Sequence, residues 1–156
     1  LKKNLTSKKF ITLSIISNNQ VSKQIKELIK LNELNIKIYE KVSNLNTKFI
    51  GNCDVVFSVG YLKKIESKII ENYEIINLHP SLLPKYKGLM THKRMLINNE
   101  NKYGYSIHKV TKYLDDGEIL SQNQQSISTS SENELSANHK RLEHQEVFKD
   151  LVNFLN

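Results

Sequence analysis

The sequence predicts an α/β fold: a mostly parallel, doubly wound sheet with helices on both faces, antiparallel strands in the C-terminal half and a long C-terminal helix. Two observations carry this prediction. Short runs rich in Val and Ile alternate with stretches of helical spacing in the N-terminal half, which is typical of strands and crossover helices in a parallel sheet. The C-terminal half changes to alternating strand patterns followed by one long amphipathic stretch, which favours antiparallel pairing and a terminal helix.

The N-terminal half contains four apolar runs of strand length. Two of them, residues 10–16 and 54–59, are apolar without alternation, as expected for strands buried on both faces. Apolar residues recur at helical spacing over 21–34 and 62–70, which predicts two helices. Residues 43–52 are polar and weakly patterned, so we expect a loop with at most a short helix. The predicted strands are 10–16, 36–39, 54–59 and 75–78.

The C-terminal half combines strand and helix patterns around one clear turn. The sequence DDG at 115–117 is typical of a turn, and Ser130 or Ser131 is a candidate N-cap for the last helix. The predicted elements are a helix over 92–98, an edge strand over 103–111, a final strand over 118–127 and an amphipathic helix over 133–155.

Composition restricts the class of protein and its compartment. The chain has 156 residues, of which 38% are hydrophobic and 25% charged, so we expect residues 1–156 to form a single domain with a substantial core. We find no apolar run of bilayer length and no secretory pattern at the start of the sequence. Cys53 is the only cysteine, which excludes an internal disulfide, favours a cytoplasmic location and is explained as a small buried apolar side chain.

The net charge of +7 comes from 23 Lys and Arg against 16 Asp and Glu. A charge of this size fits either a polyanion or a small anionic substrate. The lysines are scattered along the chain, as at Lys63-Lys64 and at Lys85 and Lys87. We therefore expect a small-molecule substrate, and neither a nucleic-acid nor a membrane partner.

The end of the strand at 75–78 carries the most specific chemistry. Asn77 and His79 are two positions apart and precede a loop bracketed by Pro80 and Pro84. In parallel sheets, ligands bind outside the carboxyl ends of the strands. Asn77 can donate hydrogen bonds to an oxygen that becomes negative, and His79 can donate a proton or stabilise the same oxygen as a cation.

Asp115 is the acid that would tune His79, because a nearby carboxylate favours the charged imidazole and raises its pKa. Asn, His and Asp together form an acyl-transfer site without a protein nucleophile, in which the attacking group is an amine of the substrate. Each residue alone also fits a structural role. Asn77 fits a cap of the strand end, His79-Pro80 fits a turn, and residues 115–117 fit an ordinary hairpin loop.

The stretch from Asn77 to Gly88, NLHPSLLPKYKG, resembles the signature of the formyltransferases that use 10-formyltetrahydrofolate. The continuation GLMTH at 88–92 narrows the resemblance to the glycinamide ribonucleotide (phosphoribosylglycinamide) formyltransferases of purine synthesis. GYSIHKVT at 104–111, LDDG at 114–117 and Gln122 match the next segment of those enzymes in order and spacing. The resemblance is strong from Ile75 to Gln122 and weaker from Ile11 to Leu155.

This resemblance implies roles for individual residues. Asn77 and His79 would act on the formyl oxygen and the tetrahedral intermediate, and Asp115 would pair with His79 and help to position a water that shuttles protons. Glu143 would bind the amine of the acceptor. The backbone that receives the pteridine ring of 10-formyltetrahydrofolate would come from Tyr61, Leu62, Lys63, Lys64 and Ile65, together with Asn77, and the loop at 108–115 would close the other side.

Three further points follow from the same comparison with the family. The Leu83-Pro84 bond falls where the family commonly has a cis peptide. His108 belongs to the family pattern, although its strand position favours a hydrogen-bonded structural histidine. No His, Cys and carboxylate cluster has the spacing of a metal site, so we expect no metal cofactor.

The sequence also departs from the family. The family opens with a strand, a Gly-rich turn and a helix that cradle the substrate phosphate; nothing here matches that unit, and residues 10–16 align with the second strand. We therefore expect a catalytic domain that is incomplete at its N-terminus, with a central strand missing and sheet edges exposed. The family has a helix between residues 39 and 54 that carries an arginine near the folate, whereas here that stretch is shortened and has no arginine. Met90 replaces a histidine that is usual in the purine enzymes.

Three interpretations fit these observations. The first is a purine-pathway formyltransferase that is incomplete. The second is a formyltransferase acting on another amine, such as a nucleotide-linked amino sugar, which the sequence DDGEI at 115–119 also fits. The third is a non-catalytic, degenerate domain that binds folate or another protein. The GLMTH motif and Glu143 favour the first, and the presence of Asn77, His79 and Asp115 disfavours the third.

Overall fold

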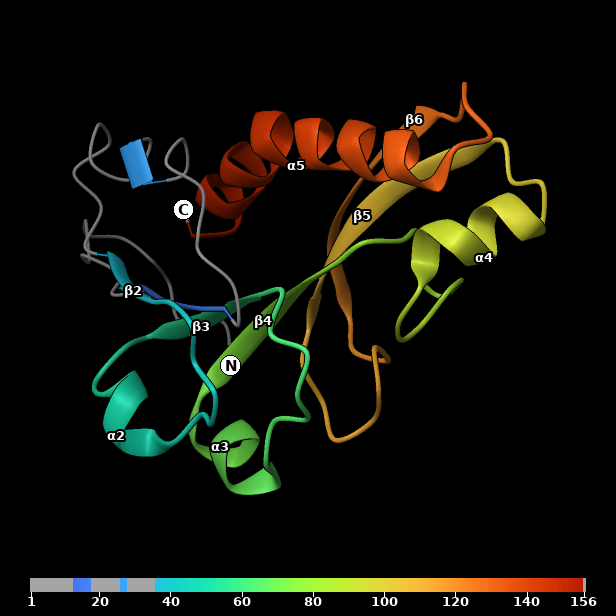
Figure 1. Cartoon of the computed structure of the whole chain (residues 1–156). Coiled ribbons are helices and arrows are strands. Elements are labelled where there is room, and N and C mark those ends of the chain that lie inside the picture. The colour runs from blue at the N-terminus through green and yellow to red at the C-terminus, as the bar shows by residue number, and fades with distance from the viewer. Residues whose placement is uncertain (1–12, 18–25, 28–35, 156) are drawn as a thin grey trace.

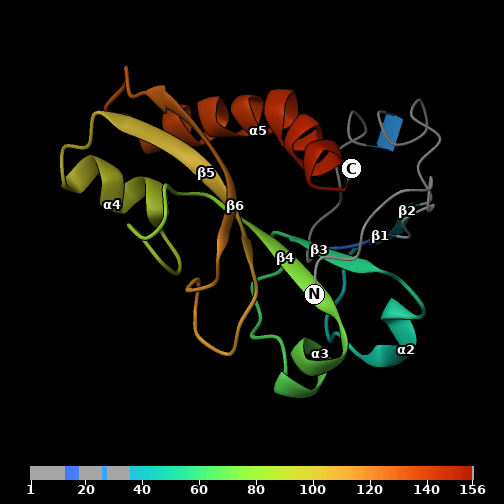
Figure 2. The same ribbon diagram turned by 180° about the vertical axis from the view of Figure 1, so that it is seen from behind.

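The computed structural model describes residues 13–17, 26–27 and 36–155, and Figures 1 and 2 show the ribbon from opposite sides. Its six strands form one sheet in the order β2-β1-β3-β4-β5-β6. β1 (Leu13–Ile16), β2 (Ile36–Tyr39), β3 (Val55–Val59) and β4 (Glu74–His79) are mutually parallel, whereas β5 (Lys102–Lys109) and β6 (Ile119–Ser126) continue the sheet as antiparallel strands. The predicted fold class is therefore confirmed.

Helices lie on both faces of this sheet. They are α2 (Thr47–Ile50), α3 (Ser67–Asn72), α4 (Thr91–Ile97) and α5 (Glu132–Leu155). Figure 1 shows the long α5 running across β5 and β6, with α2 and α3 below the parallel strands. The helix expected over 21–34 falls almost entirely outside the described residues.

Neighbouring residues on the parallel strands contribute to two separate cores. Phe57 and Ile76 belong to the cluster that packs under α5, whereas Val56 and Ile75 belong to the cluster beside α2 and α3. All four side chains are buried. Because successive strand side chains point to opposite faces, apolar residues at adjacent positions are what a strand covered on both faces requires.

β5 is an interior strand, contrary to the prediction of an edge strand over 103–111. It pairs with β4 on one side and β6 on the other, and every residue from Tyr103 to His108 is buried. Successive residues of β5 alternate between the two faces of the sheet, and both faces are covered. Tyr105 and its alternate neighbours pack in the core under α5, whereas Ser106 on the other face hydrogen-bonds the 80–88 loop. β6 is the strand at this edge.

Two further expectations need correction. α3 begins only at Ser67, because Leu62, which contributed to the helical spacing, is 68% exposed and does not face the core. The sheet also shows no interruption between its described strands. Leu13 of β1 is aligned with Ile36 on one side and with Val55 on the other, so the ladder continues directly from β2 through β1 to β3.

Candidate active site

The register between β4 and β5 brings together the polar side chains at the end of β4. Asn77 lies directly opposite His108, and His79 lies directly opposite Ser106. Residues that face each other in an antiparallel pair place their side chains on the same face. Asn77 Nδ2 is accordingly 3.3 Å from His108 Nε2, and the His79 and His108 rings are 6.3 Å apart.

The hydrogen bonds of His108 assign its tautomer and the orientation of Asn77. His108 Nδ1 is 2.8 Å from the carbonyl of Lys109, and a carbonyl can only accept, so Nδ1 carries a hydrogen. In the neutral ring Nε2 then accepts a hydrogen bond from the Asn77 amide. This contact orients Asn77 and leaves its second N–H and its Oδ1 for a ligand in the pocket.

Asp115 completes this cluster from the loop that follows β5. Its Oδ2 accepts a hydrogen bond from the Gly88 N–H at 2.8 Å and lies 3.4 Å from His79 Nδ1, and its Oδ1 lies 3.5 Å from His108 Nε2. Burial raises the pKa of Asp115, but His108, the Gly88 N–H and His79 together hold that pKa below its ordinary value. Asp115 is therefore a carboxylate at neutral pH.

The loop of Asp115 is held by a close backbone approach. A Cβ on Gly117 would lie 1.8 Å from the carbonyl oxygen of Lys109, so only glycine fits there. Asp115 itself has a φ of 45°, which is uncommon for a residue with a side chain. The turn at 115–117 is thus shaped to return the carboxylate to the end of β4.

Both ring nitrogens of His79 are engaged. Nε2 is 2.9 Å from the carbonyl of Tyr86 and donates to it, and Nδ1 faces Asp115. Burial lowers the pKa of His79; the Tyr86 carbonyl and Asp115 raise it, but the pKa stays below its ordinary value. His79 is therefore a buried base beside a carboxylate, and a direct contact with a substrate oxygen requires one of these partners to be exchanged.

A row of residues across the sheet fixes the loop that carries the Tyr86 carbonyl. Ser106 Oγ donates to the carbonyl of Ser81 at 2.7 Å and accepts from the N–H of Leu83 at 3.0 Å. Gln122 Nε2 donates to the carbonyl of Leu83 at 2.9 Å and to Ser106 Oγ at 2.8 Å. The Leu83-Pro84 bond is cis. The 80–88 loop is thus anchored to β5 and β6 by side chains that hydrogen-bond its backbone.

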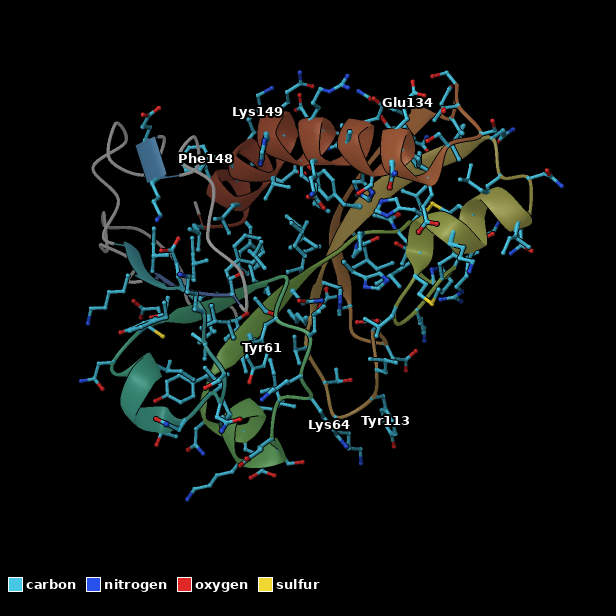
Figure 3. All side chains as sticks on the ribbon, viewed as in Figure 1. Tyr61, Lys64, Tyr113, Glu134, Phe148 and Lys149 are labelled. Atoms are coloured by element: carbon cyan, nitrogen blue, oxygen red, sulfur yellow. The ribbon has the colours of Figure 1, made fainter. Side chains whose placement is uncertain are left out.

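The cluster of Asn77, His79, His108 and Asp115 borders a pocket of about 1470 Å³ at the carboxyl ends of the parallel strands. Pockets for one drug-sized ligand have roughly 300–1,000 Å³, so this pocket has room for two substrates. The five residues from Tyr61 to Ile65 line it, as do Asn77, His79 and Asp115. Figure 3 shows Lys64 and Tyr113, which belong to two different loops at the pocket.

The pocket contains an excess of cationic side chains. The lysines in its lining are Lys63, Lys64, Lys112 and Lys140, whereas its carboxylates are Asp115 and Glu143. Opposite charge in a cleft raises the local concentration of an anionic ligand. The walls also include exposed apolar side chains, of which Leu62, Tyr113 and Leu114 are each more than 60% exposed. An anionic ligand with an aromatic or apolar body fits this lining.

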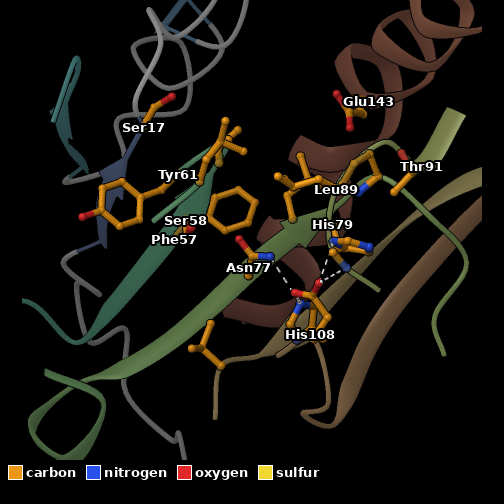
Figure 4. Close-up of a pocket in the computed structure, with 18 of the residues that line it drawn as sticks. Ser17, Phe57, Ser58, Tyr61, Asn77, His79, Leu89, Thr91, His108 and Glu143 are labelled. Carbon is orange, nitrogen blue, oxygen red and sulfur yellow. Dashed lines mark hydrogen bonds and ion pairs between the residues drawn. The ribbon is translucent and has the colours of Figure 1, made fainter. Parts of the chain in front are cut away.

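Glu143 reaches the pocket from α5, across from the cluster at the end of β4 (Figure 4). Burial raises the pKa of Glu143 to about 7, against the opposing charge of Lys140. Two histidines beside it were not expected from the sequence. His92 Nε2 and His139 Nδ1 are 2.7 Å apart, and both side chains line the pocket. The available signal was the position of His139, four residues before Glu143 on the same helix.

Among the described residues, we find no group of three or more His, Cys, Asp or Glu side chains arranged to hold a metal ion. Over the same residues, no helix has both the length and the apolar character needed to cross a membrane.

The sequence matches the formyl transferase family model over residues 16–152. The chain belongs to this family. It is 36% identical to the phosphoribosylglycinamide formyltransferase of Escherichia coli over 94 residues, which cover 58% of this chain and 44% of that protein. The resemblance to the folate-dependent formyltransferases stated from the motifs is thereby confirmed.

Other members of the family are named for different acceptors. The chain is 33% identical to the methionyl-tRNA formyltransferase of Fusobacterium nucleatum over 111 residues, covering 67% of this chain and 35% of that protein. A solved sugar N-formyltransferase from Shewanella sp. superposes with a TM-score of 0.73 at 21% identity, covering 92% of this chain and 69% of that one. The chain spans less than half the length of these two sequence relatives, and family membership does not specify an acceptor.

Proposed function

We propose that this protein transfers the formyl group of 10-formyltetrahydrofolate to the amine of glycinamide ribonucleotide in de novo purine synthesis, and that residues 1–156 form one cytoplasmic catalytic domain. One observation carries the proposal. Asn77 and His79, from the end of β4, and Asp115, from a loop 36 residues beyond His79, meet at the edge of a pocket with room for a donor and an acceptor. A structural role for each residue alone does not account for this convergence.

The proposed reaction follows from the hydrogen-bonding capacity of each group. The acceptor amine attacks the formyl carbon, and the formyl oxygen becomes an oxyanion. The free N–H of Asn77 stabilises this oxyanion. His79 stabilises the same negative charge in its protonated form, which burial disfavours and which the Tyr86 carbonyl and Asp115 favour. The proton lost by the amine ends on the leaving nitrogen of tetrahydrofolate, through a water held by Asp115.

The donor would occupy the side of the pocket formed by residues 61–65 and 108–115. Both segments line the pocket, and they combine backbone groups with exposed apolar side chains such as Leu62 and Tyr113. This lining fits a flat heteroaromatic ring, and Lys63 and Lys112 fit the carboxylates of a folate. No metal is needed for any of these steps.

The acceptor would occupy the side formed by α5 and the start of α4. Glu143 supplies a carboxylate for the acceptor amine, and Lys140 supplies positive charge for an anionic acceptor. The GLMTH sequence at 88–92 and Glu143 match the purine enzymes. These observations favour glycinamide ribonucleotide.

A nucleotide-linked amino sugar is the second candidate acceptor. It is supported by the DDGEI sequence at 115–119 and by the fold shared with the Shewanella sugar N-formyltransferase. Both candidate acceptors combine an amine with phosphate groups, so the charge of the pocket fits either. The third interpretation, a domain without catalysis, predicts folate binding without turnover.

The test is an acceptor comparison with the purified protein. Tetrahydrofolate release from 10-formyltetrahydrofolate is followed with glycinamide ribonucleotide, with a nucleotide-linked amino sugar and with methionyl-tRNA. We expect glycinamide ribonucleotide to give the highest kcat/KM, and His79→Ala to abolish transfer while donor binding persists. Faster transfer to either other acceptor, or an unchanged rate in His79→Ala, would contradict the proposal. Donor binding without transfer to any acceptor would support the non-catalytic domain.

A further inference from the structure

A buried histidine on the inner face of α5 has one ring nitrogen with no partner. His139 is 1% exposed, and its Nε2 has no hydrogen-bond partner among the described residues. A buried polar atom left unpaired costs about 1–3 kcal/mol. The ring is held by other contacts: His92 packs edge-on at 4.9 Å between ring centroids, and Tyr103 packs at 5.6 Å. These contacts fix the orientation of Nε2, so its lack of a partner requires a physical explanation.

The free nitrogen faces the carboxylate at the pocket. His139 and Glu143 are one helical turn apart on α5, and Nε2 is 3.6 Å from Glu143 Oε1. That distance is beyond a hydrogen bond, although a movement of a few tenths of an ångström would make one. On the other side of the ring, Nδ1 is 2.7 Å from His92 Nε2. The three groups thus form a row from α4, through the core, to the pocket.

Burial keeps His139 neutral. Together with His92 on α4 and His79 on β4, burial lowers the pKa of His139 to about 3. His92 itself is lowered by burial, with Glu132 and Lys140 of α5 acting in opposite directions. The uncharged phenol of Tyr103 faces the ring from β5. His139 is therefore neutral, and only one of its ring nitrogens carries a hydrogen.

We propose that His139 is a positioning residue for Glu143. His92 Nε2–H donates to His139 Nδ1, and His139 Nε2–H donates to the Glu143 carboxylate when the two groups approach each other. This hydrogen bond keeps the Glu143 carboxylate ionised and directed at the ammonium group of the acceptor. The inference rests on the proposed function, in which Glu143 receives an amine. It adds His139, which lies outside the family motifs described above, to the acceptor site and gives His92 of the GLMTH motif a partner there.

The contact would help to prepare the amine for attack. The acceptor binds as an ammonium ion, and the N–H bond that faces Glu143 breaks with its electron pair left on nitrogen. The proton forms an O–H bond on Glu143, whose carboxyl then releases it to solvent at the pocket mouth. The product of this step is a neutral amine beside the formyl carbon, and the carboxylate is restored for the next acceptor.

The test combines a titration with kinetics on matched variants. His139→Leu removes both ring nitrogens, and His139→Gln keeps an amide near the position of Nε2. Gln145→Leu places the same apolar side chain on an exposed position of the same helix and serves as the control. The Glu143 carboxyl is titrated by carbon-13 NMR in the free protein, and kcat and KM are measured for acceptor and donor across pH.

We expect His139→Leu to raise the pKa of Glu143 by about one unit, because an ionised carboxylate loses a donor. The KM for the acceptor should rise about tenfold at neutral pH, with the donor KM unchanged. His139→Gln should return the Glu143 pKa and the acceptor KM most of the way to their wild-type values, and Gln145→Leu should change neither. Thermal unfolding of each variant separates a loss of fold from a loss of contact.

The titration needs no substrate and therefore separates the two proposals. An unchanged Glu143 titration in His139→Leu overturns the positioning role, whatever the activity. A shifted titration in a protein that formylates no acceptor supports the His139–Glu143 contact and overturns the proposed function. Equal acceptor KM values in the wild type and His139→Leu overturn the link between this contact and the acceptor.

Discussion

Asp115 and Glu143 are two carboxylates of one pocket that the fold treats in opposite ways. Asp115 accepts a hydrogen bond from the Gly88 N–H at 2.8 Å and lies within 3.5 Å of ring nitrogens of His79 and His108. Among the described residues, the polar group beside Glu143 is the more distant His139 Nε2, at 3.6 Å. The pKa of Asp115 is accordingly held below its ordinary value, whereas burial raises that of Glu143 to about 7.

The difference shows that burial alone does not decide the protonation state of a carboxyl. Burial with donors makes a permanent negative charge, and burial without them makes a group that changes charge near neutral pH. Pairs of groups whose pKa values are pushed apart are how an enzyme divides acid and base work. Asp115 suits constant stabilisation of His79, and Glu143 suits the taking up of a proton from an amine.

The largest effect is expected from removing the permanent charge. Asp115→Asn keeps the size of the side chain and an acceptor for the Gly88 N–H but removes the charge beside His79. We expect kcat to fall about 1000-fold, which lies within the range for a residue that supports proton transfer. The measurement is kcat and KM with the preferred acceptor.

The adjacent Asp116 provides the control for this variant. It is exposed and pairs with Lys87 at the surface, and Asp116→Asn should stay within about twofold of the wild type. A kcat for Asp115→Asn within threefold of the wild type would show that the charge of the β4 cluster is not used in transfer.

The next effect is on the loop that supports the cluster. Ser106→Ala removes the acceptor for the N–H of Leu83 and for Gln122, and the donor for the carbonyl of Ser81. Because Ser106 is fully buried, we expect unfolding in denaturant to require about 3 kcal/mol less. The exposed Ser126→Ala on β6 should change stability by less than about 0.5 kcal/mol. Equal stabilities would mean that the 80–88 loop is held by other contacts.

The cluster at β4 could be anticipated from the sequence more fully than the α5 side. Asn77 and His79 precede a proline-bracketed loop, so residue types and spacing already indicate a site. Asp115 is predicted as the acid beside His79 from its place at the turn after a strand, whereas Glu143 is assigned only through resemblance to a family, because no local pattern shows which distant acids a fold brings together. His108 was expected to be structural; the register against Asn77 puts it in the cluster, a fact that only strand pairing supplies.

His139 was missed because its position looks structural. It follows Leu135 by four residues and precedes Leu142 by three, so it lies on the apolar stripe of α5. A histidine on such a stripe is normally a packed core residue. The helix expected over 62–70 begins only at Ser67 for a related reason: the apolar spacing included Leu62, which faces the pocket and not the core. In both places the pocket, which the sequence does not display, decides the role.

A smaller effect, dependent on pH, is expected from Glu143→Gln. The pKa of Glu143 is raised to about 7, so the carboxylate is present above that pH and is lost as pH falls through it. The ratio of kcat/KM for the acceptor, wild type over variant, should rise from near one at roughly pH 5.5 to about tenfold at roughly pH 8.5. Taking the ratio cancels the effect that the acceptor's own ionisation has on kcat/KM, because this effect is the same for both proteins.

Glu146→Gln is the matched control, because Glu146 lies on the same helix and pairs with Lys149 at the surface. Its ratio to the wild type should be flat over the same range. A flat ratio for Glu143→Gln as well would mean that the α5 carboxyl does not bind the acceptor ammonium, and that the contrast with Asp115 has no functional use.

The smallest effect tests whether the two sides of the pocket are mechanically separate. Ser131 caps α5: its carbonyl accepts the N–H of Leu135 at 2.9 Å, and its Oγ accepts the N–H of Glu134 at 3.4 Å. Ser131→Ala should cost about 1 kcal/mol of stability, and Ser130→Ala, one residue earlier, should cost nothing measurable.

Because α5 carries Glu143 and the β4 cluster does not depend on this helix end, hydrogen exchange in Ser131→Ala should increase in the first turn of α5 and stay unchanged at Asn77 and His108. The acceptor KM should then rise slightly with the donor KM constant, whereas equal changes in both would show that the pocket responds as one unit.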